Sequence, residues 1–346
     1  MKILAIDLGK FKSVACDFDV DSGQHAFRNV RTRPQDLHDL TVECTPDRVV
    51  IEIGAQAGWI QDLCQSLELE IQIANPNHEG WRWKNVKRKT DRDDALKLAK
   101  LSAVDQLPTV TLPPRSVRQW RALIEYRTKL VSRRTAIKNH IRSLIDRQGL
   151  QMPVGQQGWL RQAIKQLQAM ARPLEEVSMD ELWRGQLQLE LTALGQVEQL
   201  IDQVETKLNG IATADERVER LQTIPGVGPR LAETLVAVID DPKRFSNRKQ
   251  VASYVGLVPR QYESGTMTRQ GRITGSGHKL LRTLLVEVSW VVCRHNPPLR
   301  SIFDQVTRDS KTRRKIGIIA LARRLLIICW AMLRDGTCWR PEAVAA

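Results

Sequence analysis

The sequence has little that could cross a membrane. Its most apolar stretch, residues 316–333, is interrupted by Arg323 and Arg324, whereas a spanning helix needs about 20 apolar residues. The N-terminus reaches an acid at Asp7 without the apolar core of a signal peptide. We therefore expect no membrane partner.

Cysteine is scarce, and its spacing excludes two kinds of site. The six cysteines contain no CxxC pair and are scattered over positions 16, 44, 64, 293, 329 and 338. This spacing argues against a zinc ribbon and against a disulfide framework. A reduced, cytoplasmic protein is the expectation.

Acidic residues are outnumbered, with 39 Asp and Glu against 53 Lys and Arg, so the net charge is +14. Such a surplus predicts a polyanionic partner, and nucleic acid is the first candidate. The surplus is concentrated in two blocks: residues 81–150 hold 18 bases and 6 acids, and residues 240–346 hold 20 and 8. The rest of the chain is net acidic. Two blocks predict two nucleic-acid contact regions.

Short apolar runs predict strands in the first 75 residues, at 2–8, 13–18, 25–30, 48–53 and 70–74. Helices are expected at 57–67 and at 91–103, and the second has acids in its first turn, where the helix dipole favours them. Strands mixed with helices predict an α/β N-terminal domain.

The middle of the chain has a helical pattern. Residues 113–148 are expected to form one or two long basic helices, and residues 159–220 are expected to be helical as well. A heptad pattern occupies Leu187, Leu194, Ile201 and Leu208, with Val197, Val204 and Ile211 three residues after the last three of these. It predicts a coiled-coil-like hairpin arm or a dimerising helix, with an ordinary bundle helix as the alternative.

Residues 221–239 contain Pro225-Gly226-Val227-Gly228 between two helical patterns, which resembles a helix-hairpin-helix. Glycines allow a tight turn, and exposed amides at the next helix start can hold a phosphate. A plain turn between core helices is the alternative. The segment after Pro259, rich in Gly, Ser, Thr and Arg, is expected to be a long loop that ends in a helix from about His278.

Four acids form the first candidate site. Asp7 and Glu52 end adjacent candidate strands, while Asp91 and Asp94 are three apart and share one helix face. Convergent carboxylates suit Mg²⁺, and paired metal ions can activate the nucleophile and the leaving oxygen in phosphoryl transfer. Asp93 points to another face. Taken singly, Asp7 also fits a turn and Asp91 an N-cap.

These acids stand in motifs that resemble a known family. AIDLGK, VVIEIGAQAGW and KTDRDDA look like the Asp-Glu-Asp-Asp motifs of the DEDD-type insertion-sequence transposases, the RNA-guided (bridge-RNA) recombinases with a RuvC-like (RNase H-like) N-terminal domain. TIPGVGPRLAETLVA, RFSNRKQVASYVGLVPRQYESG and GRITGSGHKLLRTLLVE match in the C-terminal half, in the same order. GSGH replaces a usual basic stretch.

The resemblance implies a serine nucleophile in the C-terminal domain, completed by the carboxylates and Mg²⁺ of a partner subunit. In the matching motif the serine is Ser264; Ser276 and Tyr262 are the competing nucleophiles. A serine hydroxyl needs activation by a metal or a base. Spacing alone would make Ser264 a turn residue. Expected nucleic-acid contacts are Lys87, Arg88, Lys89, Gly226, Gly228, Arg260, Arg269 and Arg272.

Together these features predict an α/β plus all-α protein with three regions: a RuvC-like domain with a basic extension at 1–150, a helical arm at 151–215, and a C-terminal transposase domain at 216–346. The predicted function is Mg²⁺-dependent DNA recombination guided by a structured non-coding RNA. A dimer or tetramer on donor and target DNA is expected, in a prokaryotic, nucleoid-associated setting.

Three alternatives remain open from the sequence. The first is a RuvC-like junction resolvase or nuclease that uses water as the nucleophile. The second is an actin-like sugar kinase, because AIDLGKFKS resembles a phosphate loop, although a second such loop is missing. The third is an RNA-binding scaffold with an inactive acid pocket.

Overall fold

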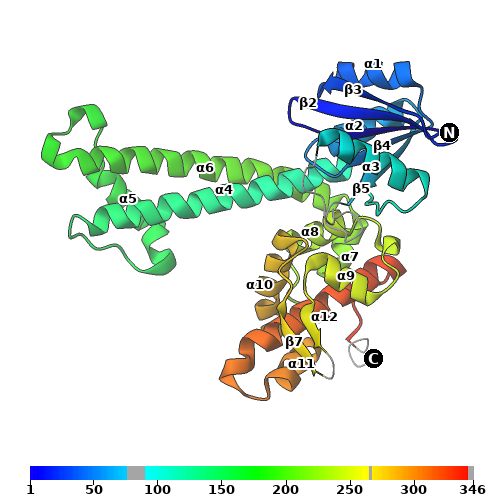
Figure 1. Cartoon of the computed structure of the whole chain (residues 1–346). Coiled ribbons are helices and arrows are strands. Elements are labelled where there is room, and N and C mark those ends of the chain that lie inside the picture. Colours follow the sequence, from blue (N-terminus) through cyan, green and yellow to red (C-terminus); the bar gives the residue numbers. More distant parts are fainter. Residues whose placement is uncertain (76–89, 265–266, 342–346) are drawn as a thin grey trace. The chain divides into compact units, whose positions relative to one another are not determined.

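Five strands near the N-terminus form one mixed sheet in the order β3-β2-β1-β4-β5 (Figure 1). β1 pairs antiparallel with β2 and parallel with β4, β2 pairs antiparallel with β3, and β4 pairs parallel with β5. The strands span Lys2–Asp7 (β1), Lys12–Asp19 (β2), His25–Arg31 (β3), Arg48–Glu52 (β4) and Glu70–Ala74 (β5). All five expected strands are therefore present.

This computed structural model describes residues 1–75, 90–264 and 267–341. The chain divides into two units, Met1–Arg118 and Gln119–Ala346. The division falls inside helix α4 (Arg115–Asp146).

In the first unit, side-chain alternation along the central strands sorts the helices onto two faces of the sheet. Leu4 and Ile6 of β1 pack with the buried side chains of α1 (Pro34–Cys44) and α2 (Ala57–Ser66). Ile3 and Ala5 point the other way and pack against α3 (Asp91–Ala103). The sheet is thus covered on both sides, as expected for the buried parallel pairs at its centre.

Helix α1 is one element that the sequence analysis missed. It begins with Pro34 in its first turn, which suits the fixed backbone angle of proline. Its buried side chains are Leu37, Leu40, Thr41 and Cys44, at helical spacing. Only two of these four are large and apolar, so the periodic signal is weak.

The second unit contains an antiparallel helical hairpin, which we call the arm, formed by α4 and α6 (Leu182–Thr213) (Figure 1). Ion pairs join Arg127 to Glu205 and Lys138 to Glu198, and a hydrogen bond of 2.8 Å joins His140 Nδ1 and Glu190 Oε1, so the two helices run in opposite directions. The short helix α5 (Arg161–Met170) packs on α6 in the connection between them.

The heptad of α6 lies inside the arm. Leu187, Leu194, Ile201 and Leu208 are buried in the same cluster as Leu130, Ile137, Ile141 and Leu144 of α4. The hairpin reading of the heptad is therefore confirmed, because the heptad side chains pack within one chain and are not exposed for a second copy.

The remaining helices pack around α12 (Arg314–Asp335). They are α7 (Glu216–Gln222), α8 (Pro229–Ile239), α9 (Arg248–Val255), α10 (Lys279–His295) and α11 (Pro297–Thr307). Short 3-10 turns are η2 (Gly155–Trp159), η3 (Leu174–Glu176), η4 (Met179–Glu181), η5 (Pro242–Arg244) and η6 (Lys311–Arg313). By length and composition α12 could cross a membrane. Its central side chains, including Leu321 and Leu325, are instead buried in the helical core.

The expectation of a long loop after residue 258 is wrong in part. Strands β6 (Pro259–Ser264) and β7 (Met267–Ile273) form an antiparallel hairpin there. Their sequences, PRQYES and MTRQGRI, are polar on both faces, so they lack the apolar alternation by which strands are recognised. Backbone pairing, with an irregularity between Pro259 and Gln261, defines this hairpin.

The arm should depend on its buried seam. Leu208 is fully buried on α6, and Leu189, on the same helix, is 55% exposed. We expect Leu208→Ala to lower the free energy of unfolding by about 2–5 kcal/mol, because it removes buried methyl groups and leaves a cavity. Leu189→Ala should change it by less than about 0.5 kcal/mol. Urea unfolding of both variants checks this, and equal losses would contradict the assignment of the seam.

Candidate active site and nucleic-acid interface

Asp7 and Glu52 lie level with each other at the ends of two neighbouring parallel strands. The pairing of Ile6 with Ile51 makes these acids the next pair along the ladder. Each acid comes two residues after a side chain that packs on the α3 face, Ala5 in β1 and Val50 in β4. Because side chains alternate along a strand, both carboxylates belong to the α3 face. Both are half-buried.

Helix α3 runs against the direction of β4, which places its first turn at the same end of the sheet. Arg48, the first residue of β4, donates from Nη1 to the carbonyl and hydroxyl oxygens of Ser102 near the end of α3, both at 3.3 Å. The Ser102 hydroxyl donates to Gln72 Oε1 of β5 at 2.8 Å. With the C-terminal end of α3 held at the start of β4, its N-terminal end lies towards Glu52.

Asp94 is the acid that α3 buries. It is 8% exposed and belongs to the same helix face as Ala95 and Leu98, which pack on the sheet. Asp91, one turn earlier, is exposed. Burial of a carboxylate is costly unless it is compensated, so a buried Asp94 needs compensation by other groups.

Asp7, Glu52 and Asp94 are each engaged with another group of the protein. Within the described ranges, no three Asp, Glu, His or Cys side chains gather closely enough to hold one metal ion. Like charges repel, and convergence of several carboxylates on one point therefore requires a compensating cation. The donors themselves are oxygen ligands of the kind that hard divalent cations take.

Asp93 has a structural role, consistent with its expected exclusion from the acid set. Its carboxylate accepts from the backbone N–H of Thr90 at 3.1 Å and from the Thr90 hydroxyl at 2.7 Å. The Thr90 hydroxyl in turn accepts from the Asp93 N–H at 3.3 Å. This reciprocal capping box fixes where α3 begins, and so fixes the position of Asp94 one residue later.

The predicted serine lies in the second unit, as the last residue of β6. Ser264 pairs with Met267 across the hairpin, and residues 265–266 lie outside the described part of the chain. The three predicted phosphate contacts of this segment, Arg260, Arg269 and Arg272, are all exposed. Arg260 also donates to the Thr274 carbonyl at 3.4 Å. Lys87, Arg88 and Lys89 lie outside the described residues.

The two competing nucleophiles have visible packing roles. The ring of Tyr262 lies over Gly271, where a side chain would collide with it. Ser276 belongs to a turn that presses on the end of α9: a Cβ on Gly256 would meet the Ser276 carbonyl, and one on Gly277 would meet the Tyr254 carbonyl. Both glycines also have positive φ angles, 77° and 83°. Close packing thus explains Gly256 and Gly277, whereas Gly275 of GSGH has open space around it and a positive φ of 71°.

Arg282 holds this turn together and was not singled out from the sequence. Its guanidinium donates to the carbonyls of Val255 and Ser276 at 2.7 Å and of Gly275 at 3.0 Å. The backbone carbonyls of a glycine-rich turn need hydrogen-bond donors, and an arginine in the following helix can supply several. This is the sequence signal that could have identified Arg282. His278 caps α10 beside it, accepting from the Leu281 N–H at 3.2 Å, and burial lowers its pKa.

The segment predicted to be a helix-hairpin-helix forms α7, a turn at 223–228, and α8. Gly226 has φ +95°, and a Cβ there would come within 3.0 Å of Val292 on α10, so this position requires glycine. Gly228 is the exposed N-cap residue of α8. Next along α8, Arg230 forms an ion pair at 3.0 Å with Glu233, which is 1% exposed.

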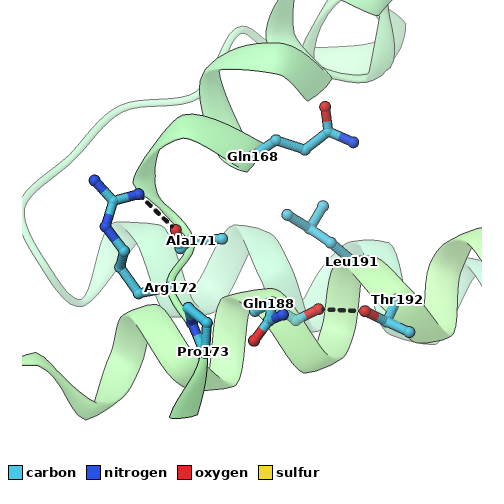
Figure 2. Close-up of a pocket in the computed structure, with 7 residues that line it drawn as sticks. All are labelled: Gln168, Ala171, Arg172, Pro173, Gln188, Leu191 and Thr192. Atoms are coloured by element: carbon cyan, nitrogen blue, oxygen red, sulfur yellow. Dashed lines mark hydrogen bonds between the residues drawn. The ribbon is translucent and has the colours of Figure 1, made fainter. Parts of the chain in front are cut away.

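A pocket of about 340 Å³ lies beside α5 and α6 in the arm, lined by Gln168, Ala171, Arg172, Pro173, Gln188, Leu191 and Thr192 (Figure 2). Its one charged side chain, Arg172, donates to the Ala171 carbonyl at 2.9 Å, and the Thr192 hydroxyl donates to the Gln188 carbonyl at 2.9 Å. These residues include no general base and no nucleophile that a base activates, so we assign no chemistry to it.

Comparisons with known proteins match two separate stretches of the chain. A model of DEDD transposases of the IS110 type matches residues 4–148, which include the sheet and α3. A second model, described as the transposase IS116/IS110/IS902 family, matches residues 218–304, which include the helix-hairpin-helix and the β6–β7 hairpin.

Individual relatives resemble the chain over most of its length. The transposase for insertion sequence element IS1111A of Coxiella burnetii is 27% identical, over 99% of this chain and 92% of the relative. A probable family 20 transposase of Pseudomonas aeruginosa is 27% identical, over 99% and 100%. A pilin gene-inverting protein of Moraxella lacunata is 27% identical, over 77% and 73%.

Glu233 should make stability depend on pH. Burial raises the pKa of its carboxyl to about 7, against an opposing effect of Arg230. The folded state therefore binds this proton more tightly than the unfolded chain does. The protonated Glu233 carboxyl contributes its full stabilisation at pH values below its pKa in the unfolded chain. This stabilisation is lost as the pH rises through about 7. Relative to Glu233→Gln, the wild-type free energy of unfolding should fall by about 3 kcal/mol from about pH 5 to pH 8. Parallel pH curves for the two proteins would contradict this.

Proposed function

The chain belongs to the IS116/IS110/IS902 family of insertion-sequence transposases and is a DNA transposase or recombinase, and from this premise we propose how it cuts and joins DNA. The proposal has four parts: a Mg²⁺ site, a serine nucleophile, a guide RNA and a multimeric assembly. The observation that carries it is the placement of Asp7, Glu52 and Asp94 at one end of the sheet.

In the first part, Asp7, Glu52, Asp91 and Asp94 hold Mg²⁺. Asp7 and Glu52 are aligned by the strand register, and Asp94 is buried on the helix face that covers the same strands. Asp91 lies one turn away at the exposed start of α3. The bound ions would polarise the DNA phosphate and lower the pKa of an attacking hydroxyl. The capping box of Thr90 and Asp93 keeps the helix start in register with the strand ends.

In the second part, Ser264 is the nucleophile. Its hydroxyl oxygen bonds to a DNA phosphorus and loses its proton, one phosphorus–oxygen bond of the DNA backbone breaks, and the departing DNA oxygen takes up a proton. The phosphodiester energy is kept in the serine ester, so a second DNA hydroxyl can reverse the step without an external energy source. The exposed guanidiniums of Arg260, Arg269 and Arg272 on the same hairpin support phosphate binding nearby.

In the third and fourth parts, a structured non-coding RNA selects the DNA, and two or four copies assemble on it. The two basic blocks support two separate nucleic-acid contacts, one near α4 and one in the C-terminal helices. Strand exchange joins four DNA ends, so more than one copy is required. The exposed Gly228 at the start of α8 supports a further backbone contact.

The metal proposal is tested by a matched pair of variants on one helix turn. Asp94→Asn should lower DNA cleavage by at least about 100-fold, because it removes a charged ligand from a site that contributes several kcal/mol. Asp93→Asn keeps an acceptor for the Thr90 cap and should cleave within about threefold of wild type. Calorimetric titration with Mg²⁺ provides a readout independent of cleavage, in which Asp94→Asn should bind more weakly. Equal metal binding and equal cleavage in both variants would refute the site.

The serine proposal is tested by trapping a protein–DNA adduct on nicked substrates with the cognate flanking RNA present. Ser264→Ala should form no adduct and no recombinant, whereas the control Ser276→Ala should retain both. Cleavage by Ser264→Ala without any adduct would favour a nuclease that uses water. The same assay without RNA tests guidance: recombination of unchanged efficiency and sequence preference would exclude it.

A further inference from the structure

A pocket of about 420 Å³ lies at the C-terminal end of α12, far along the sequence from every residue assigned above. Its floor is apolar and comes from α12, with Ile327, Ile328 and Ala331 among its lining side chains. α9 packs on the same helix and contributes Arg248. The volume falls within the range of ordinary small-molecule sites, which is roughly 300–1,000 Å³.

The charged groups around this floor favour an anion. Three arginines are among its lining residues, Arg248, Arg324 and Arg340, and Arg324 is engaged with another group of the protein. The one acid in the lining, Asp335, accepts two hydrogen bonds from Arg334, at 2.7 and 2.9 Å. The Arg334 charge therefore offsets the carboxylate, and Arg248 and Arg340 leave the pocket positive.

One wall of the pocket is aromatic and is held in place. Trp339 lines it and is half-buried against the helical core. The backbone N–H of Trp339 donates at 2.9 Å to the hydroxyl of Thr223, which lies between α7 and the hairpin turn. The indole is thus anchored at its backbone, beside the helix-hairpin-helix.

An apolar floor, an indole wall and guanidiniums at the rim together suit a particular ligand. A free inorganic anion gains nothing from the floor, and a purely apolar ligand gains nothing from the arginines. A nucleotide uses both, because its base stacks on aromatic and apolar surfaces while its phosphate pairs with arginine. Bases inside a duplex are already stacked and cannot enter.

We propose that this pocket binds one unpaired nucleotide of a single-stranded nucleic acid, with its base against Trp339 and its phosphate at Arg248 and Arg340. RNA and DNA share this chemistry. The site would hold a displaced or unpaired strand. It is independent of the proposed carboxylate and serine roles, since it concerns binding alone.

Cys338 provides a local probe, because it lines the pocket and is exposed, whereas Cys16, Cys44, Cys64 and Cys329 are buried and Cys293 is partly covered. The rate at which a maleimide labels Cys338 is measured in the full-length protein, with Cys338→Ser as the blank. A 15-nucleotide oligothymidylate should slow labelling several-fold at saturation, and a duplex of equal length should not. Comparison with oligouridylate shows whether RNA or DNA is preferred. Absence of protection by either strand would overturn the proposal.

Two variants connect protection to the proposed contacts. Trp339→Leu should raise the oligonucleotide concentration for half-protection by about 5- to 100-fold, the range that stacking of one base supplies. The double variant Arg248→Gln with Arg340→Gln should weaken protection and leave the buried core unchanged. The control, Lys311→Gln with Lys315→Gln, removes the same charge near the other end of α12 and should leave protection unchanged. If the lysine pair and the arginine pair weakened protection equally, protection would reflect general electrostatic attraction. That result would overturn the proposal.

Discussion

The parallel pairing of β1 with β4 is the constraint on which the acid site depends. It makes Asp7 and Glu52 the next pair after Ile6 and Ile51, and alternation then puts both on the face that α3 covers. A slip of one residue in either strand would turn one carboxylate to the opposite face. The apolar residues before the acids oppose such a slip, because their side chains are packed against helices on both faces of the sheet. The strand register that packs the sheet is therefore also the register that aligns the two acids.

The second unit depends on a different constraint, the burial of apolar helix faces within one chain. The α6 heptad packs on α4, and α12 is enclosed by the helices around it, so the two most apolar patterns of the sequence are both satisfied internally. The surface left for partners includes apolar side chains, such as Val154 and Met179, as well as basic ones. Exposed positions that could contact nucleic acid include the arginines of the β6–β7 hairpin, Gly228 at the start of α8, and Arg248 and Arg340 at the α12 pocket. A DNA-acting protein gains from this arrangement because its surface can be basic without weakening its core.

Much of the fold was predictable because local patterns were strong. The strand at 70–74 and the helix at 91–103 were anticipated at their exact limits, and the long basic helix was anticipated at 113–148 against an observed Arg115–Asp146. The β6–β7 hairpin was missed because its strands are polar on both faces, and α1 because half of its buried face is Thr41 and Cys44. In the candidate site, the exclusion of Asp93 was predictable from helical spacing. The burial of Asp94 and the clamp of Arg282 on three carbonyls were not, because both depend on contacts between segments distant in sequence.

By itself, the sequence determined which residue types are available and roughly where: acids at the ends of apolar runs, glycines in a tight turn, a heptad, and two basic blocks. These follow from composition and short-range periodicity, which a linear reading captures. Only the tertiary structure decided that α3 runs against β4, that the heptad faces its own chain, and that Trp339 and three arginines share one pocket. Strand register, helix direction and the closure of distant segments are set by the packing of the whole chain, and no local pattern specifies them.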